Sequence, residues 1–204
     1  MKASKVAVVD YRTSNLLSIV KALQKVGAEV EMTQDAEVIN NADRVVLPGV
    51  GAFGAAMRNI ESLGLREVLC QFGRSGKPLI GICLGMQLMF DVSYEQGKHA
   101  GLGLVHGDVV EFPSGIGLKV PHMGWNQVGF RKDSTLFHGT RDNDYAYFVH
   151  SYYVRTDDSF VAGSTDYGIP FPAVVESGNI FGIQFHPEKS QNFGLKILEN
   201  FLRV

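Results

Sequence analysis

The chain has 204 residues, of which 45% are hydrophobic and 20% are charged. This is the composition of an ordinary folded globule and excludes a largely disordered chain or a coiled coil. At about 150 residues per domain, we expect residues 1–204 to form one large domain. The 19 basic and 21 acidic residues give a net charge of -2 without a basic cluster, so a nucleic-acid partner is not expected. No apolar run suggests a membrane span or a secretory signal. Two cysteines cannot build a disulfide framework, so we expect a cytoplasmic protein.

The first half of the chain alternates strand-like apolar runs with helical patterns. Strands are expected at 5–10, 29–32, 44–47 and 79–82, and helices at 14–26, 53–63, 65–72 and after residue 84. Alternation of this kind predicts a parallel sheet covered by helices on both faces. The side chains that the first helix is expected to bury are Leu16, Leu17, Ile19, Val20, Leu23 and Val26, with Gly27 ending the helix.

From about Gly101 the pattern changes to short strands separated by turn residues. Strands are expected at 108–112, 125–130, 145–153 and 160–164, followed by a hairpin over 173–185 that turns at Gly178 and Asn179. These strands predict a mixed or antiparallel extension of the same sheet. A closing amphipathic helix is expected over 192–202, with Leu195, Leu198, Phe201 and Leu202 facing inward. The fold class is therefore α/β, in one domain with a mixed, largely parallel central sheet and a smaller antiparallel extension.

The segment 78–87 reads PLIGICLGMQ and has the pattern of a nucleophile elbow, in which a buried strand turns sharply into a helix. Cys83 occupies the nucleophile position. Gly81 and Gly85 supply the very small residues that the turn requires two positions before and after it. Because the start of a helix favours thiolate over thiol, Cys83 is a candidate nucleophile. The alternative is a small, buried hydrophobic side chain.

A cysteine nucleophile needs a base, and the segment 185–188, which reads FHPE, contains a candidate. In an extended segment, positions i and i+2 share a face, so we expect His186 and Glu188 to point the same way. Glu188 would accept the imidazole N–H and fix the tautomer that takes the thiol proton. The strand pattern before this segment brings the pair to the carboxyl edge of the sheet, where Cys83 is also expected. The alternative is a solvated surface histidine.

The segment 48–54 reads PGVGAFG and contains a literal G-x-G-x-x-G, a pattern found in dinucleotide-binding proteins. That fingerprint expects an acidic residue about 20 residues later, where this chain reads LCQFGR, and no proline before the glycines. We therefore favour the alternative that Gly49 and Gly51 expose backbone N–H groups beside Cys83. With the amide of Leu84, the N–H groups of Gly49 and Gly51 would form an oxyanion hole. Neither the histidines nor the cysteines have metal-ligand spacing, so we expect no metal and no cofactor.

With the elbow and the FHPE segment in place, the sequence resembles the class I (triad) glutamine amidotransferases over essentially its whole length. Within that family, the segments PGVG (48–51), PHMGWN (121–126), YFVHSY (147–152) and HPEKS (186–190) are similar to the glutaminase subunits of imidazole glycerol phosphate synthase. The resemblance implies a flavodoxin-like fold of the class I glutaminase type. It also implies that Cys83 attacks the side-chain amide of glutamine, His186 carries the proton and Glu188 holds His186.

The same resemblance implies substrate and partner contacts. Gln87 and Glu95 are similar to residues that bind the charged ends of glutamine, with the backbone of His150, Ser151 and Tyr152. For Glu95 the alternative is a solvated acid. The implied partner is a (β/α)8-barrel cyclase subunit that forms a heterodimer, receives the ammonia and makes imidazole glycerol phosphate for histidine biosynthesis. Residues similar to the interface gate for ammonia are Trp125, Asn126, Tyr147 and Lys189, and the alternative for Trp125 is a core residue.

One position departs from the family pattern: where members usually have glycine after the first strand, this chain has Arg12. The loop is expected near the rim that faces the barrel, so the change bears on docking and partner choice and leaves the triad untouched. Two other functions stay open at this point. One is a glutaminase subunit that feeds a different acceptor synthase, and the other is a catalytically silent assembly subunit.

Overall fold

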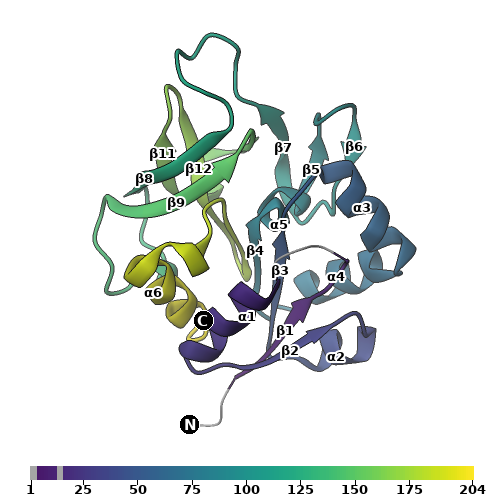
Figure 1. Cartoon of the computed structure of the whole chain (residues 1–204). Helices are drawn as coiled ribbons and strands as arrows, with labels where there is room; N and C mark the ends of the chain where they lie inside the picture. The colour runs from purple at the N-terminus through teal and green to yellow at the C-terminus, as the bar shows by residue number, and fades with distance from the viewer. Residues whose placement is uncertain (1–3, 13–15) are drawn as a thin grey trace.

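The protein is described by a computed structural model that covers residues 4–12 and 16–204. Nine strands form the main sheet in the order β2-β1-β3-β4-β13-β12-β11-β8-β9 (Figure 1). The first five in this order run parallel, and the remaining pairs are antiparallel, so the sheet is mixed as predicted. The parallel strands are β1 (Lys5–Val9), β2 (Glu29–Thr33), β3 (Arg44–Gly49), β4 (Leu79–Cys83) and β13 (Ile180–Ile183). The antiparallel strands are β12 (Pro170–Ser177), β11 (Val161–Asp166), β8 (His122–Phe130) and β9 (Asp144–His150).

Helices cover both faces of the parallel half, which confirms the prediction from the β-α alternation. Helices α1 (Leu16–Lys25) and α6 (Gln191–Phe201) lie on one face, and α2 (Ala36–Asn41), α3 (Phe53–Ser62) and α4 (Leu65–Arg74) lie on the other (Figure 1). Each face has its own apolar core, and alternate residues of β1 contribute to each. Val6 and Val8 pack in the core beneath α1 and α6, whereas Ala7 and Val9 pack in the core beneath α2, α3 and α4.

A second sheet was not expected. It has the order β10-β7-β5-β6, built from β5 (Phe90–Ser93), β6 (His99–Ala100), β7 (Val105–Glu111) and β10 (Tyr152–Arg155). The prediction of one strand over 145–153 is wrong, because the chain bends at Ser151. Strand β9 before the bend belongs to the main sheet, and β10 after it pairs with β7. The strands predicted at 108–112 and 145–153 are therefore divided between two sheets instead of extending one.

Two helix faces also differ from the predictions. In α1, Leu16, Ile19 and Leu23 are buried, but Leu17 is 65% exposed because it lies a quarter-turn away from that stripe. Ser14 and Asn15, with which the predicted helix began, lie outside the described residues. In α6 the buried apolar side chains are Phe193, Ile197, Leu198 and Phe201, whereas Leu195, and Leu202 just after the helix, are only partly buried.

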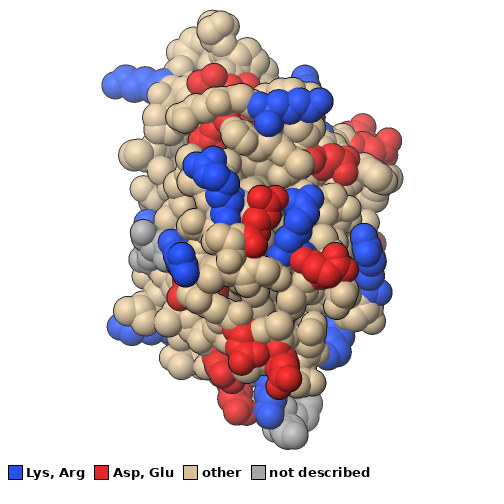
Figure 2. Space-filling view, turned by 90° about the vertical axis from the view of Figure 1, so that its right-hand side faces the viewer, with Lys and Arg blue, Asp and Glu red and all other residues tan. Residues whose placement is uncertain are grey.

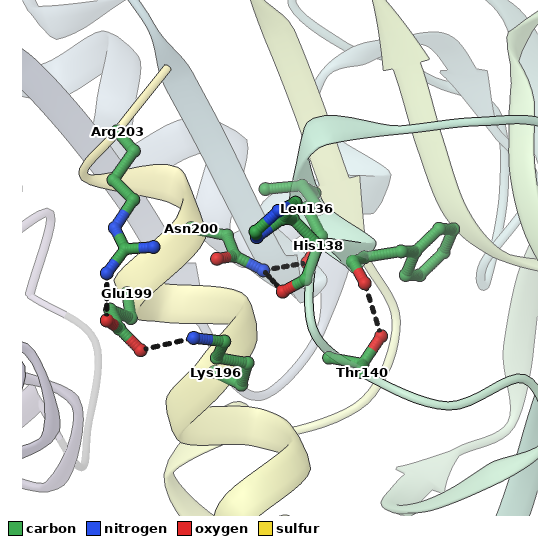
Figure 3. A network of polar contacts seen from close by, with 8 residues as sticks. Leu136, His138, Thr140, Lys196, Glu199, Asn200 and Arg203 are labelled. Atoms are coloured by element: carbon green, nitrogen blue, oxygen red, sulfur yellow. Dashed lines mark hydrogen bonds and ion pairs between the residues drawn. The ribbon is translucent and has the colours of Figure 1, made fainter.

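Helix α6 is held to the rest of the fold by a buried amide (Figure 3). The Asn200 side chain is 1% exposed, and its Nδ2 atom donates to the carbonyl oxygens of Leu136 at 2.8 Å and His138 at 2.7 Å. On the exposed side of the same helix, Glu199 pairs with both Lys196 and Arg203. The amide fixes α6, and with it the segment that precedes the helix, against the short 3-10 turn η1 (Thr135–Phe137).

Charged side chains are mixed on the surface seen in Figure 2. Lys and Arg lie interspersed with Asp and Glu over most of this face, and acidic side chains gather at its lower edge beside a basic one (Figure 2). Among the described residues, no helix is both long enough and apolar enough to cross a membrane.

Candidate active site

Cys83 lies at the carboxyl end of β4, where the chain turns directly into α5 (Leu84–Leu88). Its backbone has φ 54° and ψ −112°, a strained conformation for a residue with a side chain. A Cβ atom on Gly81 would lie 2.6 Å from the Gly85 carbonyl oxygen, and one on Gly85 would lie 1.7 Å from the Leu47 carbonyl oxygen. Both glycines are therefore required by close backbone approach, which confirms the predicted elbow geometry.

His186 and Glu188 form a buried pair next to this elbow. The Nδ1 atom of His186 lies 2.9 Å from Oε1 of Glu188, and the two side chains are 5% and 6% exposed. The expected extended geometry is wrong, because Pro187–Lys189 forms the 3-10 turn η3. The turn nevertheless brings the two side chains together, as the i and i+2 spacing was expected to do. The Nε2 atom of His186 is buried and has no hydrogen-bond partner within residues 4–12 and 16–204, so it is the ring nitrogen left for a reaction.

The electrostatic environment favours the protonated imidazole. Burial alone would lower the pKa of His186, but the neighbouring Cys83 sulfur and the Glu188 carboxylate bonded to Nδ1 raise that pKa to about 10. At neutral pH, His186 therefore holds a proton beside the sulfur. The Sγ atom of Cys83 lies 3.8 Å from Nε2 of Gln184 and 4.0 Å from the carbonyl oxygen of Val149.

The backbone of His186 is fastened to the edge strand β9. His186 N donates to the Tyr147 carbonyl oxygen at 2.9 Å, and Tyr147 N donates to the Ser190 hydroxyl at 2.9 Å. The same hydroxyl donates to the His186 carbonyl oxygen at 2.6 Å. Ser190 is 1% exposed, so these bonds are shielded from water. His186 is thus positioned through both its side chain and its backbone.

A cavity of about 410 Å³ opens above Cys83 and His186. It brings together all the residues predicted for the substrate with Gly51 and Leu84 of the predicted oxyanion hole, whereas Gly49 does not line it. Glu188 does not line the cavity. Besides Val50, Pro121 and Val149, the lining comprises Cys83, His186, Gly51, Leu84, Gln87, Glu95, His150, Ser151 and Tyr152.

The glycine-rich segment 48–54 leaves no room for a pyrophosphate at Gly49 and Gly54 but is open at Gly51. A Cβ atom on Gly49 would lie 2.2 Å from the Tyr11 hydroxyl, and one on Gly54 would lie 2.8 Å from the His99 ring. These two glycines are packed against protein. Gly51 has φ +99°, and a Cβ atom there would meet nothing within 4 Å, so it borders open space in the cavity. The N–H of Leu84, in the first turn of α5, has no partner inside that helix.

The side chains of Gln87 and Glu95 are partly or fully buried and are fixed by hydrogen bonds. Gln87 is 5% exposed, and its Nε2 donates to the Tyr152 carbonyl oxygen at 2.9 Å and to Gln184 Oε1 at 3.1 Å. Glu95 is half-buried, and its Oε2 accepts from Phe53 N at 2.6 Å, so it is not a fully solvated acid.

Three of the four residues predicted for the ammonia gate form one cluster at the surface. Trp125 is 47% exposed, so it is not a core residue. Its ring packs edge-on against Tyr147 at 5.9 Å, and Lys189 Nζ lies 5.5 Å from the centre of the Tyr147 ring. Asn126 differs, because it lies on the inward face of β8. Its Nδ2 contacts His122 Nε2 at 3.3 Å and donates to the Asp166 carbonyl oxygen at 2.8 Å.

Comparison with known protein families agrees with this geometry. A family model described as "Glutamine amidotransferase class-I" matches residues 7–204. The chain belongs to the class I glutamine amidotransferase family.

Two relatives of this chain in other organisms carry the same protein name. The chain is 51% identical over 198 residues to imidazole glycerol phosphate synthase subunit HisH of Aquifex aeolicus, covering 96% of this chain and 95% of that protein. It is 50% identical to the HisH subunit of Archaeoglobus fulgidus, covering 98% of each chain. A solved structure titled PurLQS from Thermotoga maritima has a TM-score of 0.75 at 21% identity, covering 98% of each chain. That last likeness shows the shared fold.

Three residues of this amidotransferase site were not assigned a role from the sequence. Ser190 clamps His186, and nothing in its pattern indicates this, because both of its partners are backbone atoms. Gln184 contacts the Cys83 sulfur. It lies just after β13 and two residues before His186, so side-chain alternation along an extended segment could have indicated that the two point the same way. His122 lies buried behind the cavity and contacts His150 at 3.1 Å.

Proposed function

We propose that the chain hydrolyses glutamine to glutamate and ammonia through a thioester on Cys83. The observation that carries this proposal is the shared cavity: Cys83 on a strained elbow faces the same space as His186, whose other ring nitrogen is bonded to buried Glu188. The names of the close relatives support the same reaction class.

The reaction follows from this geometry in two halves. The Cys83 sulfur attacks the side-chain amide carbon of glutamine, while the thiol proton rests on His186 Nε2. That proton passes to the amide nitrogen, the C–N bond breaks, and ammonia leaves. Water then gives a proton to His186 and attacks the thioester carbon, which releases glutamate and restores the thiolate. Glu188 holds the ring and stabilises its charged form throughout.

The cavity lining supplies roles for glutamine binding. The N–H groups of Gly51 and Leu84 act as the oxyanion hole, in which one donor typically contributes on the order of 10²–10³ in rate. Gln87 and Glu95, together with the backbone of His150, Ser151 and Tyr152, hold the α-amino and α-carboxylate ends. The half-buried carboxylate of Glu95 suits the ammonium group, since it is fixed at the start of α3.

Ammonia in neutral water is mostly ammonium, which is not a nucleophile. The proposal therefore includes a partner subunit that receives the ammonia without its release into water. We propose a (β/α)8-barrel cyclase subunit that makes imidazole glycerol phosphate in histidine biosynthesis. The outward face of the β8–β9 hairpin supports a docking surface, because it exposes large apolar side chains. Met123 is 62%, Trp125 47% and Tyr145 55% exposed. The Trp125, Tyr147 and Lys189 cluster on this face, with Asn126 on the inward side, would border the ammonia exit.

Glutamate release by the purified chain tests the proposal, first alone and then with a cyclase subunit bearing its nucleotide substrate or product. Strong stimulation by the cyclase supports both the reaction and the partner. Glutamate release that the cyclase does not change would indicate that the partner is a different acceptor synthase. No activity in either condition, with the two folded proteins shown to bind, would favour a catalytically silent assembly subunit.

Covalent labelling of Cys83 separates an active glutaminase from a catalytically silent subunit. A glutamine-like electrophile is expected to modify Cys83 and not Cys70, which is also a free, buried thiol. Cys70 lies on the buried face of α4 and is therefore the matched control for thiol reactivity away from the cavity.

A further inference from the structure

Two histidines lie side by side in the interior behind the glutamine cavity. His122 on β8 and His150 on β9 are directly paired across the strands and are 2% and 6% exposed. The His122 ring is stacked between Phe148, at 4.8 Å, and Tyr167, at 4.0 Å. Burying two titratable rings among aromatic side chains is costly unless every ring nitrogen is hydrogen-bonded.

The contacts of the two rings admit only one arrangement of protons when both are neutral. His150 Nδ1 lies 2.8 Å from the Tyr152 carbonyl oxygen, which can only accept, so this nitrogen carries the hydrogen. His150 Nε2 is then bare and accepts from His122 Nδ1 at 3.1 Å. His122 Nε2 is bare in turn and accepts from Asn126 Nδ2 at 3.3 Å.

Both rings are held in this neutral state by their surroundings. Burial lowers the pKa of His122 to about 4 and is also the main cause that lowers the pKa of His150 to about 3. A proton added to His150 Nε2 would also face the N–H of His122, so the chain of bonds itself opposes protonation. At neutral pH the hydrogen bonds therefore run in one fixed direction, from Asn126 towards Tyr152.

The inner end of this series of hydrogen bonds reaches Cys83. The Tyr152 carbonyl oxygen accepts a second hydrogen bond, from Gln87 Nε2 at 2.9 Å, so both of its lone pairs are used. Gln87 also donates to Gln184 Oε1 at 3.1 Å, and Gln184 Nε2 lies 3.8 Å from Cys83 Sγ. The path is continuous from the β8–β9 hairpin to the sulfur without passing through the substrate.

We propose that His122 and His150 are positioning residues, whose fixed hydrogen bonds hold the Tyr152 carbonyl and Gln87 in the arrangement that binds glutamine. Neither ring is required to touch the reacting atoms. The proposal rests on the proposed glutaminase function, because the Tyr152 carbonyl and Gln87 border its substrate cavity. A purely structural role in the aromatic core would need the volume of the rings and not the direction of their protons.

The ring-nitrogen NMR spectrum of the wild-type chain at neutral pH tests the chain of bonds without any enzyme assay. The expected result is that both histidines carry hydrogen on Nδ1 and have a bare Nε2. Hydrogen on Nε2 of either ring, or a protonated ring, would overturn the proposal. If the expected spectrum is found in a chain that does not hydrolyse glutamine, the proposed function fails and the hydrogen-bond chain stands.

Two variants at His122 test the consequence for the cavity. In His122→Asn the amide nitrogen lies near the place of Nδ1 and can still donate to His150, whereas His122→Leu keeps apolar volume and cannot donate. We expect the KM for glutamine to rise about tenfold in His122→Leu, the effect of one lost hydrogen bond. The KM should stay within about threefold of wild type in His122→Asn, and kcat should change less than KM in both variants.

Alkylation of Cys83, separated from that of Cys70 by peptide mass, gives a second readout that needs no turnover. We expect the Cys83 rate to change in His122→Leu and to return towards wild type in His122→Asn, with the Cys70 rate constant in both. Equal KM and equal Cys83 alkylation in wild type and folded His122→Leu would overturn the positioning role. If His122→Leu does not fold, a His122→Asn chain with tenfold weaker glutamine binding would overturn it as well.

Discussion

Replacing Ser190 with alanine is the sharpest test of how the base is held, because the structure allows its cost to be worked out. The hydroxyl makes two bonds, accepting from Tyr147 N and donating to the His186 carbonyl oxygen. Without it, Tyr147 N loses its partner in a site where Ser190 is 1% exposed, at a cost of about 1–3 kcal/mol. The His186 carbonyl keeps a bond from Lys189 N at 3.1 Å, so its loss is smaller, about 1 kcal/mol. We expect a total destabilisation of about 2–4 kcal/mol.

Chemical denaturation and glutaminase kinetics measure the two effects of Ser190→Ala together. The free energy of unfolding should fall by the amount above, and kcat should fall because His186 is no longer clamped to β9. Ser62→Ala is the matched control: its hydroxyl bonds to the Asn59 carbonyl at 2.9 Å on the exposed end of α3 and should matter by less than about 0.5 kcal/mol. Equal unfolding free energies and equal kcat for the two variants would refute the reasoning.

Three further predictions follow from the site and the loops around it. Glu188→Gln should reduce kcat/KM by roughly 10²–10⁴-fold. Because the pKa of His186 is raised from 6.5 to about 10, the stabilisation from its partners is present below pH 6.5 and is lost as the pH rises to 10. The loss of stability in Glu188→Gln, measured by denaturation, should therefore be largest near pH 6 and shrink towards pH 10, and a pH-independent difference would count against it. Gly85→Ala should cost more than about 4 kcal/mol or prevent folding, since the added Cβ would lie 1.7 Å from the Leu47 carbonyl oxygen, and a stable variant with wild-type thermal unfolding would contradict the elbow geometry. Arg12 has φ 63°, so Arg12→Gly should relieve strain and stabilise the chain by about 0–1 kcal/mol with unchanged glutamine turnover, while Arg12→Ala should bring no gain in a denaturation assay.

The regular part of the fold could be predicted from the sequence because its signals are local. The elbow at Cys83 needs Gly81 and Gly85, and the clashes that a Cβ atom would make there explain why this pattern is so specific. The short elements were missed for a physical reason. Helix α2 has six residues and too little apolar periodicity, although its N-cap is present in the sequence: Asp35 Oδ1 accepts from Glu37 N at 2.7 Å.

The division between two sheets could not be predicted, because it depends on tertiary contacts. Apolar residues lie on both sides of the polar pair His150 and Ser151, and two polar residues within a strand pattern do not by themselves indicate that the chain changes sheets there. The same bend lets the residues after His150 line the cavity, while the outer face of β9 stays exposed at Tyr145. The sequence pattern therefore identified these residues but not the change of sheet that positions them.

Within the site, the sequence predicted which residues gather and could not predict how they are held. Cys83 and His186 line one cavity as expected, with Glu188 bonded behind His186. The inward turn of Asn126 was not predicted, since its partners His122 and Asp166 are brought to it only by the fold. Clamps of this kind use backbone atoms and buried rings, which carry no spacing signal along the chain.

The measurement that tests the central claim most directly is glutamate release from glutamine by the wild-type chain and by Cys83→Ala, each with a cyclase subunit bearing its nucleotide ligand. Cys70→Ala serves as the control for loss of a buried thiol. The account predicts turnover in wild type and in Cys70→Ala, stimulated by the cyclase, and none in a folded Cys83→Ala chain. Glutamate release that persists in Cys83→Ala would contradict it.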